Sequence, residues 1–232
     1  GWNSDTSLCP GGVTVAYGPG TGVNCNLALA GCFHGTHVAG IAAGRSASLN
    51  GVAKDATIIS LQVFTRIDQP SVCSPNPVPC IQAYWRDLAA ALDYIYTNLQ
   101  YNNRIASVNM SIGGQTYTAA CDTAEPSMTN AINRLRTVGI GSVVASGNNS
   151  STNGISAPAC ISSAISVGAT TKSDTVAAFS NSASFLKLLA PGDSILSSVP
   201  TSTYAYYSGT SMAAPHVAGT LAILRQAKPG AT

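Results

Sequence analysis

The sequence has few charged residues, and this scarcity disfavours several classes of protein. Only 9% of the 232 residues are charged, the net charge is +2, and no Lys/Arg cluster is present. Nucleic-acid binding needs a basic patch, so we expect no nucleic-acid partner. Disorder is disfavoured too, because disordered chains combine high charge with few apolar residues, whereas 45% of this chain is apolar.

Long apolar runs and metal-binding patterns are also missing. No run reaches the roughly 18 apolar residues of a membrane span, so we expect no membrane association. Residues 1–4 lack the basic and apolar regions of a signal peptide, which indicates either a mature form or a chain whose front is absent. The nine acidic residues show no EF-hand-like spacing, so no metal ligand is assigned.

The cysteines form no C-x-x-C pair, which makes zinc and redox sites poor interpretations. Disulfides formed in an oxidising compartment are the better one, and they predict a secreted, extracellular protein. The alternative is a set of buried free thiols. Cys73 and Cys80 bracket a Pro-rich stretch that a disulfide could close. Because the number of cysteines is odd, one of them has no partner within the chain: Cys9, Cys25, Cys32, Cys73, Cys80, Cys121 and Cys160.

What the sequence does contain is an alternation of strand and helix patterns. Residues 1–33 are typical of loops, and 65–82 of an inserted loop with four prolines. Alternating strands and helices predict one α/β domain over 1–232, with a mostly parallel sheet whose active site gathers at the carboxyl ends of the strands. The strands are expected at 56–64, 105–112, 140–146 and 164–169, and the helices at 34–44, around Leu88 to Leu99, around Met128 to Leu135, and at 211–227.

Three segments stand out within this pattern. Each has an ordinary structural interpretation when taken alone. A His next to Gly is usually structural, Gly-Asn after a strand is usually a turn, and Gly-Thr-Ser before an apolar helix is usually an N-cap. The segments are FHGTHVAG at 33–40, ASGNN at 145–149 and GTSMAAPHVAG at 209–219.

Together these segments provide the groups that acyl transfer requires. A serine hydroxyl is a weak nucleophile until a neighbouring base takes its proton, and imidazole suits that task near neutral pH. Ser211 lies where a loop enters a helix, so its backbone N–H is free to face an oxyanion. Asn148 follows a strand and offers a side-chain amide as a second donor. Pro215 is expected in the first turn of the helix, where a missing N–H costs little.

The three segments, in this order, resemble those of the subtilisin-like serine peptidases. The histidine and serine segments match the family's motifs, and SVNMSIGG at 107–114 resembles the strand that lines the peptide cleft. The resemblance covers about residues 31–228. It implies a three-layer fold in which His34 is the general base and acid, Ser211 the nucleophile and Asn148 an oxyanion donor. His37 and His216 match positions that are structural.

The resemblance also implies a substrate cleft and a secreted endopeptidase that acts on polypeptides, as a monomer. The chemistry requires no cofactor, although calcium as a structural ion is compatible with the family. Residues 145–160 contain no acidic residue, so we expect a broad, mainly apolar preference rather than cleavage after Lys or Arg. The expected cleft residues are Ser111, Ile112 and Gly113 on one side, pairing with the substrate backbone, and Ala145, Ser146 and Gly147 on the other.

One part of the family pattern is absent from the sequence. The family's catalytic Asp ends an apolar strand and reads Asp-[Ser/Thr]-Gly, upstream of the histidine. Here the only acidic residue before His34 is Asp5, which follows Gly-Trp-Asn-Ser and precedes Thr6-Ser7. We interpret Asp5 as a turn-forming surface residue, and expect that the N-terminal strand carrying the triad acid is missing from a truncated catalytic domain.

Two other functions compete with that of an active peptidase. A non-catalytic peptide-binding homologue would keep the cleft and lack the triad acid, although Ser211 and His34 are both intact. An esterase on an α/β-hydrolase fold would need G-x-S-x-G and a serine that precedes its histidine, whereas His34 precedes Ser211 here.

Overall fold

The centre of the molecule is a parallel sheet whose strand order is β4-β6-β8-β9. The computed structural model describes residues 5–74 and 76–230. The four strands are β4 (Ser107–Met110), β6 (Gly141–Ala145), β8 (Ile165–Thr170) and β9 (Leu188–Pro191), and every adjacent pair is parallel. Such a sheet brings the carboxyl ends of its strands to one edge, where functional residues usually gather.

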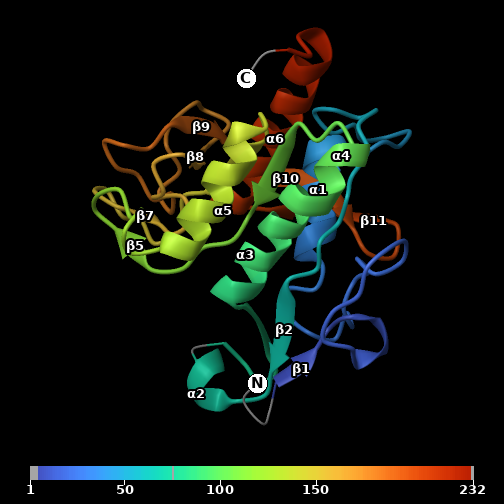
Figure 1. Ribbon diagram of the computed structural model, residues 1–232. Coiled ribbons are helices and arrows are strands. Elements are labelled where there is room, and N and C mark those ends of the chain that lie inside the picture. Colours follow the sequence, from blue (N-terminus) through green and yellow to red (C-terminus); the bar gives the residue numbers. More distant parts are fainter. Residues whose placement is uncertain (1–4, 75, 231–232) are drawn as a thin grey trace.

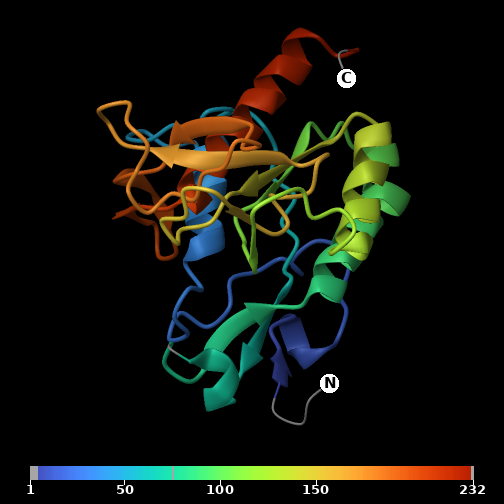
Figure 2. The same ribbon diagram turned by 90° about the vertical axis from the view of Figure 1, so that its left-hand side faces the viewer.

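Helices cover both faces of this sheet and make three layers (Figures 1 and 2). One face packs against α3 (Trp85–Tyr94) and α5 (Pro126–Thr137), and the other against α6 (Thr210–Ala227), next to which lies α1 (His34–Ala43). A π-helical turn, η2 (Ile95–Leu99), and the short α4 (Gln100–Asn102) extend α3. The predicted three-layer α/β fold is therefore confirmed.

The periodic apolar positions explain these helices. Leu88, Leu92 and Ile95 form the stripe that α3 and η2 bury against the sheet. Pro126 begins α5 in the first-turn position that tolerates a missing N–H, and Met128, Ile132 and Leu135 form its buried face. The predicted helices at 34–44, 88–99, 128–135 and 211–227 are confirmed, as are the strands near 105, 140 and 164.

The predicted strand at 56–64 is wrong. Of this range only Phe64 belongs to a strand. Ile58 and Ile59, which are apolar and favour strands, are exposed. A strand requires a neighbour with which to form hydrogen bonds. The parallel sheet ends at β4, and no strand in the described residues lies beside residues 57–63. Their apolar pattern therefore has no partner here.

The expected loops at 1–33 and 65–82 contain a small antiparallel sheet, which lies apart from the parallel sheet in both ribbon views (Figures 1 and 2). Its strands are β1 (Asp5–Ser7), β2 (Phe64–Ile67) and β3 (Cys80–Ala83), with α2 (Pro70–Cys73) between the last two and a single 3-10 turn, η1 (Pro10–Gly12), after the first. Asp5 is thus a half-buried strand residue that accepts a hydrogen bond from the Tyr84 hydroxyl, not a surface turn residue.

Two further β-pairs and three disulfides complete the fold. Strand β5 (Thr116–Tyr117) pairs with β7 (Ile155–Ser156), and β10 (Ile195–Val199) pairs with β11 (Thr203–Tyr207), both antiparallel. The disulfides support the predicted oxidising compartment and leave Cys9 as the free thiol. They join Cys25 to Cys32, Cys73 to Cys80 and Cys121 to Cys160.

Candidate active site

A cavity of about 360 Å³ lies at the carboxyl ends of β4 and β6, beside the start of α6. It brings together Ser211, Asn148 and most of the cleft residues that the sequence predicted. Its walls carry no charged side chain. The lining residues are Ser111, Ile112, Gly113, Gly114, Ala145, Gly147, Asn148, Asn149, Ser156, Thr210 and Ser211.

Ser211 lies in the first turn of α6, where backbone N–H groups have no partner within the helix. Its hydroxyl donates a long hydrogen bond, 3.4 Å, to the Ser111 carbonyl. In return the Ser111 hydroxyl donates to the Ser211 carbonyl, at 2.7 Å. The helix and the cleft strand are therefore tied together at the candidate nucleophile.

Pro215 explains why the Ser211 carbonyl is free to accept that bond. Four residues after Ser211, Pro215 has no N–H to donate to it, as a normal helical residue would. Pro215 is the sixth residue of α6, which starts at Thr210, so the expectation that it lies in the first turn is wrong. The missing helical bond is replaced by the one from Ser111.

Asn148 is held by the residue that starts the same helix. Its Oδ1 accepts hydrogen bonds from the Thr210 backbone N–H and the Thr210 hydroxyl, both at 2.9 Å. This fixes Nδ2 on the side of Gly209. A Cβ at Gly209 would lie 3.4 Å from Asn148 Nδ2 and 3.7 Å from the Ser211 nitrogen. Two N–H donors thus flank one glycine, an arrangement suited to binding an oxyanion.

His34 is the first residue of α1, a helix that packs against α6. It does not line the cavity, and no hydrogen bond joins it to Ser211 in the described part of the chain. Burial and, secondly, the nearby His37 lower the pKa of His34 below 6.5. Within residues 5–74 and 76–230, no carboxylate forms an ion pair or hydrogen bond with its ring. Asp5 is bound to Tyr84 instead.

The other two histidines have the surroundings of structural residues. His37 is 0% exposed, its Nε2 lies 3.0 Å from the Ala205 carbonyl, and its ring packs edge-on against Tyr207. His216 Nδ1 lies 2.9 Å from the Met212 carbonyl within α6. Burial lowers the pKa of both rings, with these carbonyl bonds opposing the shift.

Ser146 is the predicted cleft residue that the structure does not bring to the cavity. It is buried, and its hydroxyl donates to the Asn181 carbonyl at 2.8 Å. Sequence reasoning in turn missed some lining residues. Thr210 and Asn149 are direct neighbours of assigned residues, which is a usable signal. Ser156 lies within the 145–160 segment but seven residues beyond the Gly-Asn-Asn motif, in the short strand β7, and nothing local in the sequence marks it as a lining residue.

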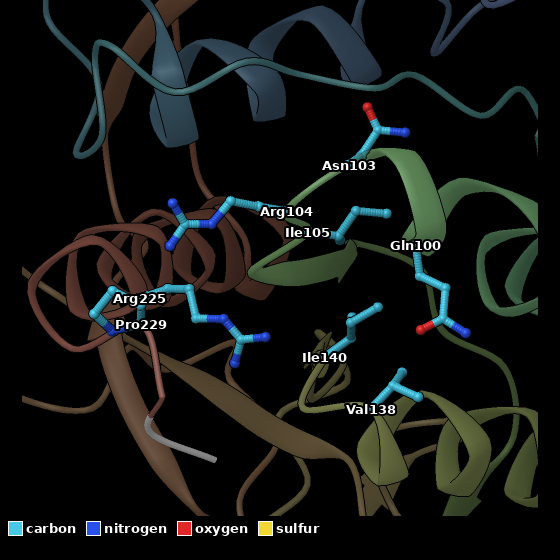
Figure 3. Close-up of a pocket in the computed structure, with 8 residues that line it drawn as sticks. All are labelled: Gln100, Asn103, Arg104, Ile105, Val138, Ile140, Arg225 and Pro229. Carbon is cyan, nitrogen blue, oxygen red and sulfur yellow. The ribbon is translucent and has the colours of Figure 1, made fainter.

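A second cavity, of about 210 Å³, lies at the opposite end of the sheet, before β4 and β6 begin (Figure 3). Ile105, Val138 and Ile140 form its apolar side, and Arg225, which donates to the Gly139 carbonyl, lies on the other. None of the predicted site residues lies in it. The remaining lining residues are Gln100, Asn103, Arg104 and Pro229.

Fold and site together define a three-layer α/β domain with a serine and an amide donor at the start of one helix. The family model described as "Subtilase family" matches residues 19–232. The chain therefore belongs to the subtilase family, as its motifs predicted.

Individual relatives agree with this assignment. The chain is 40% identical over 201 residues to an extracellular serine proteinase of Thermus sp. (strain Rt41A), covering 86% of this chain and 42% of the relative. It is 34% identical over 191 residues to a thermophilic serine proteinase of Bacillus sp. (strain AK1), covering 82% and 42%. With Subtilisin Savinase of Lederbergia lenta it shares 35% over 198 residues, covering 84% and 64%.

A solved structure gives the same answer for the fold. A cold adapted subtilisin-like serine proteinase superposes with a TM-score of 0.65 at 33% identity, over 86% of this chain and 63% of that one. The chain thus spans less than two thirds of these relatives. Among the residues that the structure describes, no helix is both long and apolar enough to span a membrane.

Proposed function

We propose that this chain provides the nucleophile, the histidine and the oxyanion donors of a secreted serine endopeptidase. The observation that supports this most directly is the position of two N–H donors, one from Ser211 and one from Asn148, around the same glycine. The Ser211 N–H and the Asn148 amide flank Gly209 at the start of α6, beside a cavity between the predicted cleft segments. Relatives named as serine proteinases match 82% and 86% of the chain.

The proposed reaction proceeds through an acyl-enzyme. His34 takes the proton of the Ser211 hydroxyl while its oxygen attacks the carbonyl carbon of the scissile peptide bond. Asn148 Nδ2 and the Ser211 N–H stabilise the oxyanion that forms. His34 then gives the proton to the departing amine. Water, deprotonated by the same histidine, releases the acyl group and restores the hydroxyl.

The triad acid is proposed to come from a segment outside residues 1–232. A carboxylate beside His34 would fix its tautomer and orientation, and in the described residues no such group is present. The proposal explains why His34 and Ser211 make no hydrogen bond here, because an unanchored imidazole has no reason to adopt the reactive geometry. The rival is a peptide-binding homologue that never had the acid.

The proposed substrates are polypeptides bound in an extended conformation along residues 111–113. Backbone pairing gives affinity with little side-chain selection. The cavity wall consists of glycines and uncharged side chains, with no carboxylate to recognise Lys or Arg. A broad, mainly apolar preference follows. The proposed reaction uses no metal ion, calcium would act only as a structural ion, and the enzyme is proposed to be a secreted monomer.

Cleavage of a peptide library tests this function. The chain, extended upstream along its own reading frame, is expected to cut mainly after apolar residues. The Ser211→Ala variant should be inactive, while Ser173→Ala, an exposed serine away from the cavity, should retain full activity. Exclusive cleavage after Lys or Arg would refute the proposed preference, and equal turnover by Ser211→Ala would refute the proposed nucleophile.

A further inference from the structure

Asn181 is the most completely enclosed amide near the cavity, yet it does not line it. The residue lies in the segment that connects β8 to β9 and is 0% exposed. A buried amide is costly unless its donors and acceptor are satisfied. The polar atoms of Asn181 all have hydrogen-bonding partners, and most of these partners belong to the loop that follows β6.

Asn181 holds the chain on both sides of Asn148, through its side chain on one side and its backbone N–H on the other. Its Oδ1 accepts hydrogen bonds from the backbone N–H groups of Asn149, at 2.8 Å, and Ser151, at 3.1 Å. Its own backbone N–H donates to the Gly147 carbonyl, at 2.9 Å. Asn148 is therefore flanked by two residues whose backbones are fixed by Asn181.

The donor side of the same amide faces the cavity wall. Nδ2 lies 3.4 Å from the Ser156 hydroxyl and 3.5 Å from Asn149 Oδ1, two residues that line the cavity. It also lies close to Gly147, whose φ is +105°. A Cβ at Gly147 would come within 2.4 Å of Asn181 Nδ2, so the close approach requires glycine.

Only an uncharged amide fits both sets of partners. Two N–H groups need an acceptor on one side, and two oxygens need a donor on the other. An aspartate would retain the acceptor, lose the donor and bring a buried charge. A leucine of similar size would leave the Asn149 and Ser151 N–H groups without a partner.

We propose that Asn181 is a positioning residue for catalysis, which acts through Asn148 by holding residues 147–151 in the shape that aims the Asn148 amide at the oxyanion. Thr210 holds the side chain of Asn148 and Asn181 holds its backbone. This inference rests on the proposed function. It concerns a residue that touches neither substrate nor nucleophile.

A double-mutant cycle in the upstream-extended protein tests this role. Asn148→Ala should lower kcat by about 10²–10³-fold, the size found for one oxyanion donor in a serine peptidase of this family, with little change in KM. Asn181→Leu should lower kcat at least about tenfold. In the Asn148→Ala background it should lower kcat less than about threefold, because coupled residues are not additive.

The outcomes separate the inference from the function on which it rests. If Asn148→Ala leaves kcat unchanged, the proposed oxyanion donor is wrong, and with it the route by which Asn181 would act. If Asn148→Ala is impaired but Asn181→Leu lowers kcat equally in both backgrounds, or not at all, only the role of Asn181 is refuted. Asn153→Ala, an exposed asparagine of the same loop, is the matched control and should match wild type.

A second variant covers the case in which Asn181→Leu does not fold. Asn181→Asp keeps the shape and the acceptor but lacks the Nδ2 donor, and should show the same dependence on Asn148 with a smaller loss of kcat. Full kcat in folded Asn181→Asp, together with unprotected Asn149 and Ser151 amides in hydrogen exchange of the wild type, would overturn the proposal.

Discussion

The region from β4 to α6 and the region before β4 use similar residues with different results. Beyond residue 104, strands rich in Val, Ile and Ala are buried between helices, and Val143, Val144 and Val167 are completely covered. Before it, an equally β-branched segment at 57–63 forms no strand, and Val15, Tyr17 and Ile58 are exposed. A strand pattern yields a strand only when its sheet neighbour is present.

The candidate site reflects the same contrast. Ser211 and Asn148 come from the well-packed region and are held by Thr210 and Ser111. His34 comes from the other region, and in the described residues its ring has no hydrogen-bonding partner. The nucleophile and the oxyanion donor are therefore held in place by hydrogen bonds, whereas the His34 ring is not. Adding the proposed upstream strand, which would be the sheet neighbour of residues 57–63 in the region before β4, should correct both defects.

The largest expected effect is on turnover. Extending the chain upstream to include an acid-bearing strand should raise peptide hydrolysis by about 10⁴-fold, the typical cost of losing the triad acid in a serine peptidase. The measurement is kcat/KM for a chromogenic peptide, with and without the extension. Equal rates would show that residues 1–232 already contain every catalytic group. An Asp→Asn change in the extension is the matched control.

Truncating an apolar side chain should cost several kcal/mol more unfolding free energy in the well-packed region than in the region before β4. Leu135→Ala removes a side chain that is 0% exposed and should cost about 2–5 kcal/mol of unfolding free energy. Ile58→Ala, where the side chain is 48% exposed, should cost under about 0.5 kcal/mol in this chain. Denaturant unfolding measures both.

The same pair of variants can be compared in the extended protein. The cost of Ile58→Ala should rise there if the added strand covers residues 57–63, while that of Leu135→Ala should stay the same. Equal costs for Ile58→Ala in both proteins would contradict the idea that this segment lacks a partner only in the shorter chain.

Removing a disulfide should also lower the unfolding free energy more in the region beyond residue 104 than in the region before it. Replacing Cys121 and Cys160, which are 39 residues apart, should cost about 4 kcal/mol, because a longer loop gains more entropy on opening. Replacing Cys25 and Cys32, only 7 residues apart, should cost about 2.5 kcal/mol. Thermal unfolding of the two double Cys→Ala variants checks the order, and the reverse order would contradict the loop-length argument.

The smallest expected effect is on the titration of His34. In this chain burial lowers its pKa below 6.5, so the neutral ring persists to lower pH. A carboxylate beside it favours the charged ring, so the pKa should rise in the extended protein. NMR titration measures both, with His34→Gln assigning the signal. A pKa that is unchanged by the extension would argue against an acid partner.

The lowered pKa values of the buried histidines also link stability to pH. Because His37 and His216 bind protons less readily when folded than when unfolded, acid favours the unfolded chain. Their contribution is present above pH 6.5, and is lost as the pH falls below this value. Unfolding measured between pH 8 and pH 5, roughly one to two units either side of the histidine pKa, should show this decline.

Much of the well-packed region could be predicted from sequence because its signals are local. The stripe of Leu88, Leu92 and Ile95, the apolar strands and the helix entry at Ser211 each depend on neighbouring residues. The small sheet of β1, β2 and β3 was missed, since it joins residues 5–7 to residues 64–83 and has no local pattern. Asn181 was missed for the same reason, because its role lies in contacts with residues about 30 positions away.

The most direct test of the account is labelling of Ser211 with a fluorophosphonate probe, located by mass spectrometry. The upstream-extended protein should be labelled at Ser211 rapidly, and residues 1–232 alone should be labelled far more slowly at the same serine. Absence of labelling in a correctly folded extended protein would contradict the peptidase assignment and favour the peptide-binding homologue.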